Sequence, residues 1–125
     1  MAVVLDARAL IAVERSDASV GAVLRLVQQN RIPVRTRGAA AAQVWRPGSI
    51  QAQLARVLAG IEVMVLDESA GRSIGELLRR SGTGDVVDGH VTLIVRSGDT
   101  VLTSDAGDIG SMLEEPRVSA TVHAI

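Results

Sequence analysis

Five aspartates in this 125-residue chain have the type and spacing needed to bind a cation, namely Asp6, Asp85, Asp88, Asp105 and Asp108. Asp6 ends the short apolar run Val3-Val4-Leu5. The other four form two pairs with three-residue spacing, and residues at i and i+3 share one face of a helix. Carboxylate oxygens, in a chain without cysteine, favour Mg²⁺ or Mn²⁺ over zinc. The pattern predicts a site for one of these two ions.

Each acid taken alone also has a structural explanation. Asp6, Asp85 and Asp105 stand where a helix N-cap belongs. Asp88 and Asp108 then fall in a first helical turn, where the helix dipole favours negative charge. If the first and fourth strands are neighbours, however, at least three carboxylates meet at one edge and repel one another. A divalent cation resolves that repulsion.

The elements that position these acids alternate along the chain. Short apolar or β-branched runs at 3–5, 32–36, 62–66, 100–103 and 118–125 predict strands, and helical spacing fills the segments between them. This alternation predicts an α/β fold, with a mostly parallel central sheet and helices on both faces. The length predicts one domain spanning 1–125. Ligands of such sheets bind beyond the carboxyl ends of the strands, where the acids lie.

The composition limits the classes of function. The chain is 47% hydrophobic and its net charge is −1, so its overall charge does not indicate nucleic-acid binding. All 13 basic residues are arginine, which suits phosphate. Trp45 is the only aromatic residue, so base stacking is not a main mode of recognition. No apolar run approaches the ~20 residues of a membrane span and no signal peptide is present, which predicts a soluble, cytoplasmic protein.

Rival α/β chemistries lack their motifs. The turn after the first strand has no Gly-x-Gly-x-x-Gly for a dinucleotide, and the chain has no P-loop. His-Glu-x-x-His and Gly-x-Ser-x-Gly are also absent. The lysine that a phospho-receiver or an aspartate-nucleophile phosphatase needs is missing as well.

The acidic segments resemble a known family. Val3-Val4-Leu5-Asp6 running into Ala9-Leu10-Ile11-Ala12, then Asp88-Gly89-His90-Val91, and Thr103-Ser104-Asp105-Ala106-Gly107-Asp108 are similar, in order and spacing, to PIN-domain ribonucleases of the VapC toxin type. The resemblance implies a three-layer α/β/α sandwich and Mg²⁺- or Mn²⁺-dependent cleavage of RNA. It also implies a cognate antitoxin protein as partner, a homodimer and a toxin role in a toxin–antitoxin system.

The resemblance also implies roles for particular residues. Asp6, Asp88 and Asp105 match metal-binding acids, and Asp108 matches an accessory acid, so these four are the expected catalytic residues. Gln43 stands where the family has a glutamate and carries no charge, which lowers the expected metal affinity. Asp85 or Glu14 could compensate for it. Gly89 departs from the family's alanine and costs a helix about 1 kcal/mol, but it leaves room for a close approach.

Further side chains are predicted at the same rim. Thr103 and Ser104 could orient a metal ligand or donate to phosphate, although capping also explains Ser104. Arg35, Arg37 and Arg46 could hold RNA phosphates, although a solvated face explains them too. His90 and His123 are expected to be structural. An apolar groove among the helices expected at 7–15, 20–30 and 49–59 could receive an amphipathic antitoxin helix.

Two other functions remain open from the sequence. Gln43 could mark a degenerate domain that binds RNA or a partner protein without cleaving it. The acids could equally serve a metal-dependent DNA nuclease, because carboxylates do not distinguish the 2′-hydroxyl of RNA.

Overall fold

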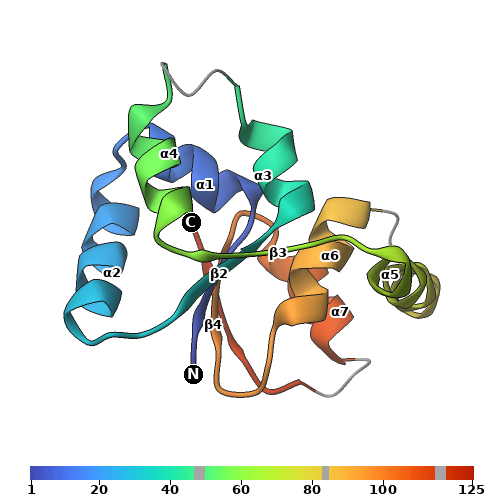
Figure 1. Cartoon of the computed structure of the whole chain (residues 1–125). Coiled ribbons are helices and arrows are strands. Elements are labelled where there is room, and N and C mark those ends of the chain that lie inside the picture. The colour runs from blue at the N-terminus through green and yellow to red at the C-terminus, as the bar shows by residue number, and fades with distance from the viewer. Residues whose placement is uncertain (47–49, 83–84, 115–117) are drawn as a thin grey trace.

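The computed structural model describes residues 1–46, 50–82, 85–114 and 118–125. Its centre is a five-stranded sheet in the order β3-β2-β1-β4-β5, and every pair of neighbouring strands is parallel (Figure 1). The strands are β1 (Val3–Leu5), β2 (Val34–Arg37), β3 (Glu62–Met64), β4 (Thr100–Thr103) and β5 (Thr121–Ala124). The first strand therefore lies in the middle of the sheet, between β2 and β4.

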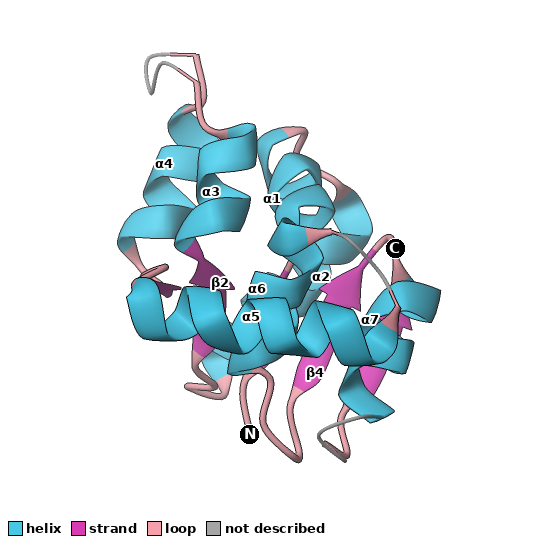
Figure 2. Cartoon of the chain, turned by 90° about the vertical axis from the view of Figure 1, so that its right-hand side faces the viewer, coloured by secondary structure: helices cyan, strands magenta, loops and turns pink. Residues whose placement is uncertain are grey.

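The helices lie on both faces of this sheet. They are α1 (Ala7–Glu14), α2 (Ala18–Gln29), α3 (Gly38–Val44), α4 (Ala52–Ala59), α5 (Glu68–Ser81), α6 (Val86–Ile94) and α7 (Ala106–Glu114). In Figure 1, α5, α6 and α7 gather on one side of the sheet, while α1, α2 and α4 lie on the other. Figure 2 shows α5 as the outermost helix of its group. The alternation of strands and helices in the sequence predicted this α/β arrangement.

An aliphatic core holds the layers together. β1 is buried along its whole length, and Leu5 pairs in register with Leu102 of β4. Leu10 and Ile109 are fully buried on helices from the two faces. The described part of the core contains no aromatic side chain, as the composition requires. Many small contacts between Val, Leu, Ile and Ala side chains therefore hold the core together, in place of a few large aromatic contacts.

Three predicted strands are shorter or shifted in the structure. β2 begins only after Pro33, whose missing N–H cannot join a ladder, although its carbonyl accepts from Val3 N at 2.9 Å. β3 ends at Met64 rather than at residue 66, and β5 covers 121–124 rather than 118–125. Both are edge strands with one neighbour each, so fewer ladder bonds extend them.

Candidate functional site

The site lies at the carboxyl edge of the sheet, between the ends of β1 and β4. The chain leaves β1 into α1 on one face and leaves β4 into α7 on the other. Such a change of face between two neighbouring strands opens a crevice beyond their carboxyl ends, where ligands of α/β proteins bind. Pairing of β1 with β4 confirms the neighbour relationship on which the predicted convergence of acids depended.

Asp6 is buried at the bottom of this crevice and is 2% exposed. Its Oδ1 accepts from Ala9 N at 2.8 Å and so caps α1. Its Oδ2 accepts from Ser104 N at 3.2 Å, in the turn that follows β4. The capping explanation is therefore correct for Asp6, but the same carboxylate also links the two strand ends that form the crevice.

Asp88 is the most unusual acid of the group. It is only 6% exposed, and its Oδ2 is buried without a hydrogen-bond partner among the described residues. Burial, as the largest cause, and the negative charges of Asp85, Asp105 and Asp6 together raise its pKa from 3.8 to about 7. A buried, unpartnered carboxylate that faces three like charges is stabilised only by a proton or by a cation.

The other acids surround Asp88 at different depths. Asp85 caps α6 by accepting from Asp88 N at 3.0 Å. Asp105 is exposed, and its N–H donates to Thr103 Oγ1 at 2.9 Å, which fixes the turn before α7. Asp108 is exposed in the first turn of α7 and is not among the charges that raise the Asp88 pKa. The structure thus gathers four acids and leaves Asp108 at the periphery.

Asp85 and Glu14, which were expected to compensate for the missing charge of Gln43, lie in different parts of the structure. Asp85 is in the acidic group, as described above. Glu14 ends α1, whereas Asp6 caps its beginning, so the eight-residue helix places them roughly 12 Å apart. Gln43 is exposed on α3, and its backbone carbonyl accepts from Arg46 Nη1 at 3.5 Å. Neither Gln43 nor Glu14 is among the groups that act on Asp88.

The three arginines predicted at this rim have other contacts, and the prediction needs correction. Arg35 pairs with Glu62 and with Asp99, which directly precedes β4, so it lies at the opposite, amino edge. Arg37 is buried, and its Nε donates to the carbonyl of His90 at 2.7 Å. Burial lowers the Arg37 pKa to about 10, partly offset by Asp67.

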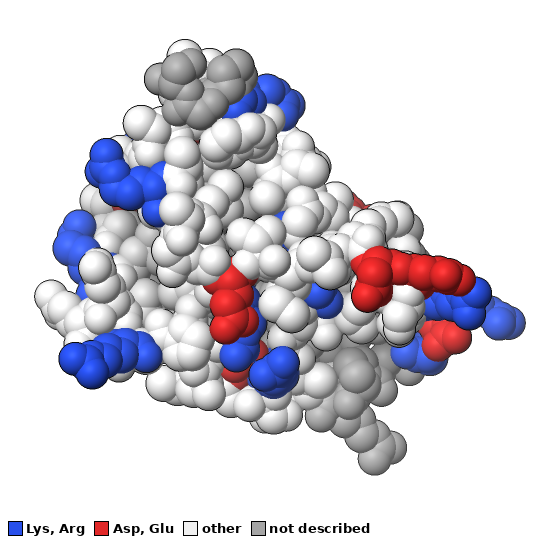
Figure 3. All heavy atoms as spheres, in the orientation of Figure 1, with Lys and Arg blue, Asp and Glu red and all other residues white. Residues whose placement is uncertain are grey.

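The third of these arginines, Arg46, is exposed, and its Nη1 donates to the Trp45 carbonyl at 2.6 Å. Charges of both signs are interspersed on the face seen in Figure 3, which shows no continuous basic surface. Neither the individual arginines nor this face therefore indicates an extended site for a nucleic acid.

The residues beside Asp88 on α6 have structural roles. His90 is fully buried, and burial together with Arg37 lowers its pKa, so it is neutral at pH 7. A Cβ at Gly89 would lie 2.9 Å from Ile74 Cγ2 and 3.2 Å from Leu78 Cδ2. The close approach that Gly89 permits is therefore that of α5 against α6.

The acidic group has the chemistry of a site for a hard cation. Its donors are carboxylate oxygens, and the buried Asp88 Oδ2 is available because no hydrogen bond occupies it. Within the described residues, no three Asp, Glu or His side chains already stand close enough to surround one ion. The residues fit Mg²⁺ or Mn²⁺ in type and charge, and binding would have to draw the carboxylates together.

Comparisons with known proteins locate the fold. No family model matches the chain, and no curated protein matches it. Among solved structures, a chain of VapBC2 from Rickettsia felis bound to a DNA fragment from their promoter is similar, at 15% identity and a TM-score of 0.69, over 98% of this chain and 99% of that one. A chain of FitAcB from Neisseria gonorrhoeae is similar at 18% identity and a TM-score of 0.56, over 95% and 96% of the two chains.

These findings correct the family assignment made from the sequence. The similar structures are complexes of toxin–antitoxin systems, which contain an antitoxin, and similarity to them does not identify this chain as the toxin. No family model matches the chain, so none supports the expected PIN-like sandwich. The fold is instead described as α/β with a five-stranded parallel sheet, shared with chains of two such complexes.

The function expected from the sequence needs correction, as the family does. The first of the two similar structures is bound to a DNA fragment, and similarity to the two does not indicate ribonuclease activity in this chain. The assignment as an endoribonuclease toxin that cleaves RNA is therefore not retained. What the comparisons do support is a fold shared with chains of these two structures. In the described ranges, no helix is long and apolar enough to cross a membrane.

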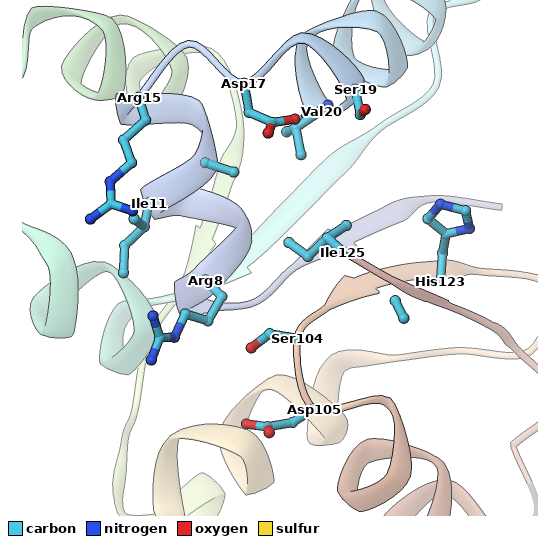
Figure 4. Close-up of a pocket in the computed structure, with 12 residues that line it drawn as sticks. Arg8, Ile11, Arg15, Asp17, Ser19, Val20, Ser104, Asp105, His123 and Ile125 are labelled. Carbon is cyan, nitrogen blue, oxygen red and sulfur yellow. Dashed lines mark hydrogen bonds between the residues drawn. The ribbon is translucent and has the colours of Figure 1, made fainter.

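Sequence reasoning missed two arginines beside the acids. Arg8 and Arg15 line the same pocket as Ser104 and Asp105 (Figure 4). Their seven-residue spacing is two helical turns, and the helix that carries Arg8 begins directly after Asp6. This spacing was the signal in the sequence that could have identified them.

Proposed function

We propose that this chain is one component of a two-protein complex of the toxin–antitoxin kind and that its acidic edge binds a divalent cation, Mg²⁺ or Mn²⁺. One observation carries the cation proposal, namely the buried Asp88 Oδ2 that has no hydrogen-bond partner and faces three like charges. An isolated buried charge of this kind is strongly unfavourable unless an opposite charge accompanies it.

Three carboxylates would hold the ion. Asp88 supplies the unoccupied oxygen, Asp105 supplies an exposed carboxylate beside it, and Asp6 retains lone pairs beyond its two bonds to backbone N–H groups. Thr103 Oγ1 positions Asp105 by accepting its N–H. Cysteine is absent and His90 is not among the groups that act on Asp88, so the donor set is that of Mg²⁺ or Mn²⁺ rather than of zinc.

Calorimetry with Mn²⁺ tests the cation site directly. Wild-type protein should bind Mn²⁺, and Asp88→Asn, which keeps the side-chain shape, should weaken binding at least tenfold. The matched control is Glu114→Gln, because Glu114 is an exposed acid at the far end of α7 from Asp105. Wild-type protein that binds no Mn²⁺ at millimolar concentration, or Asp88→Asn protein that binds as tightly as the wild type, would refute the proposal.

Metal-dependent hydrolysis of a phosphodiester is the second candidate function. The convergence of carboxylates at the β1–β4 crevice favours it. A bound divalent cation would supply a water of lowered pKa and would stabilise charge on phosphate oxygens. The chain's own contribution is to hold Asp6 and Asp105 at fixed places through Ala9 N, Ser104 N and Thr103 Oγ1.

A small chromogenic substrate tests hydrolysis separately from binding. Bis(p-nitrophenyl) phosphate should be hydrolysed with Mn²⁺, and neither in EDTA nor by Asp88→Asn. If the wild type binds Mn²⁺ but releases no p-nitrophenol, the cation site stands and the hydrolase proposal fails.

The partner protein has a suitable surface on the other side of α1. A groove of about 490 Å³ lies between α2 and α4, with an apolar floor formed by Leu24, Val27, Ile32, Val57 and Ile61. Arg25 and Arg56 stand on its rim. An amphipathic helix with acidic flanks has the shape and charge to fill it. The two-protein complexes among the structural neighbours support this proposal.

Co-expression tests the partner surface. The chain and the product of its neighbouring reading frame should elute together from a sizing column. Arg25→Glu should release the partner, whereas Arg79→Glu, an exposed arginine on α5 outside the groove, should not. Equal retention of the partner by both variants would exclude this groove as the interface.

A further inference from the structure

A hollow beside the acidic edge has features that the cation site alone does not explain. It has a volume of about 690 Å³ and lies between α1, the beginning of α2 and the ends of β4 and β5. Its polar lining includes Arg8, Arg15, Ser104 and Asp105, and Ile11 and Ile125 supply apolar wall. In Figure 4, the tips of Arg8, Arg15, Ser104 and Asp105 point toward the same side of the hollow.

The two arginines are free to bind a ligand. Both are exposed, and neither has an ion pair or a side-chain hydrogen bond with another described residue. Arg8 is the second residue of α1 and Arg15 is its C-cap, so about two helical turns separate them, which is roughly 10 Å. Their guanidinium groups therefore present two positive charges along a line rather than at one point. That arrangement matches an extended anion with more than one charge.

Asp105 and Ser104 occupy the opposite wall. Asp105 and Arg8 line the same hollow without forming an ion pair, so open space separates opposite charges. The exposed Ser104 hydroxyl has no hydrogen bond within the described chain and is available as a donor. A ligand in this hollow must satisfy the guanidinium groups and lie next to the carboxylates of Asp105 and of Asp17, which also lines the hollow.

We propose that this hollow binds a phosphate-bearing anion, with Arg8 and Arg15 on its phosphate oxygens. Guanidinium forks suit phosphate and carboxylate alike. The acidic wall favours phosphate, because Mg²⁺ is commonly held by one or two carboxylates together with ligand phosphates. The inference deepens the proposed cation site by naming the class of ligand that would bind beside it. The part of the inference that concerns Asp105 rests on that proposed site. Among the described residues that line the hollow there is no Phe, Tyr or Trp, so the main contacts of a ligand are with its phosphates.

Calorimetric titration at low salt tests this inference with two probes, inorganic pyrophosphate and the deoxydinucleotide pTpT. In EDTA, wild-type protein should bind pTpT, and Arg8→Gln combined with Arg15→Gln should weaken binding roughly 100-fold, about tenfold for each charged contact. Arg79→Gln is the matched control and should bind like the wild type. Tighter binding of pTpT than of pyrophosphate assigns a nucleotide chain, and equal binding assigns the phosphate group alone.

Three results would overturn the inference. They are the absence of pTpT and pyrophosphate binding to the wild type, equal weakening by Arg79→Gln, and tighter binding of a hexaglutamate peptide than of either phosphate probe. A parallel titration with Mn²⁺ distinguishes failure of the phosphate proposal from failure of the cation proposal. Arginine-dependent binding in EDTA by a protein that binds no Mn²⁺ would refute the cation site and leave the phosphate site standing. Unchanged circular dichroism of each variant confirms that it is folded.

Discussion

Ser104 N donates to Asp6 Oδ2 at 3.2 Å and so joins the carboxyl ends of β1 and β4, across 98 positions of sequence. The other oxygen of the same carboxylate caps α1. The Asp6 carboxylate therefore makes structural hydrogen bonds and is also a proposed ligand of the cation. Substitutions at this position must be interpreted through both roles.

Substitutions of Asp6 should lower the free energy of unfolding, and alanine should lower it more than asparagine. Asp6→Ala removes the cap and leaves the Ser104 N–H without its acceptor, so we expect a loss of roughly 2–4 kcal/mol in the free energy of unfolding. Asp6→Asn keeps one acceptor oxygen and should lose about half as much. Urea unfolding in EDTA measures both. Asp17→Ala, which removes only the α2 cap, is the control and should lose about 1 kcal/mol. An Asp6→Ala loss no larger than that of Asp17→Ala would contradict the dual role.

Asp88 should make stability depend on pH when no metal is bound. Its pKa in the folded protein, about 7, lies above that of the unfolded chain, so the folded state holds the proton more tightly. The Asp88 contribution to stability is therefore fully present below about pH 4 and is lost as the pH rises to 7, by an upper limit on the order of 4 kcal/mol. In EDTA, the Asp88→Asn variant should have the same melting temperature as the wild type at pH 4 and a clearly higher melting temperature at pH 8. Parallel melting curves across this range would show that Asp88 titrates normally.

Gly89→Ala should destabilise the protein although alanine favours helices. The added Cβ would meet the buried Ile74 at 2.9 Å, and overpacking of this kind costs about 1–3 kcal/mol against a propensity gain of about 1 kcal/mol. We expect a net loss near 1 kcal/mol in urea unfolding. At Gly75 on α5 the added Cβ meets nothing within 4 Å, so Gly75→Ala should be neutral or stabilising. Stabilisation by both substitutions would mean that α5 and α6 separate easily.

Arg35→Gln should affect stability and leave phosphate binding unchanged. Arg35 neutralises Asp99, which is 2% exposed and accepts from Ala2 N and Arg96 N. We expect a loss of roughly 1–3 kcal/mol, as for weakening of a partly buried pair. The pTpT affinity should equal that of the wild type, because Arg35 lies at the amino edge. A selective loss of pTpT affinity with unchanged stability would restore Arg35 to the candidate site.

Local patterns in the sequence predicted most of the architecture. The apolar run Val3–Leu5 and the strand 100–103 were located correctly because both are buried central strands with strong patterns. The edge strands were predicted too long, since their ends depend on neighbours rather than on composition. Pairing of β1 with β4 brings the ends that carry Asp6 and Asp105 to one edge, because parallel strands place their carboxyl ends together, whereas the cation site that these two acids would form with Asp88 stays a prediction.

Side-chain contacts set the limit of prediction at the site. Arg35 and Arg37 come from one strand, yet one reaches an ion pair at the amino edge and the other is buried against His90. Sequence position does not determine such choices, because long side chains extend several ångströms in either direction. The family assignment failed for a related reason, since short acidic motifs recur wherever strands end in helix caps.

The central place of β1 has a consequence for how the chain folds. β1 is made first during synthesis, yet its partner β4 begins at residue 100, and the Asp99 carboxylate that holds Ala2 N lies 97 positions away. The middle of the sheet is therefore completed only after β4 has been synthesised, and loop closure over this distance slows folding. Until then β1 exposes an unpaired edge, which makes the unfinished chain a natural client for chaperones.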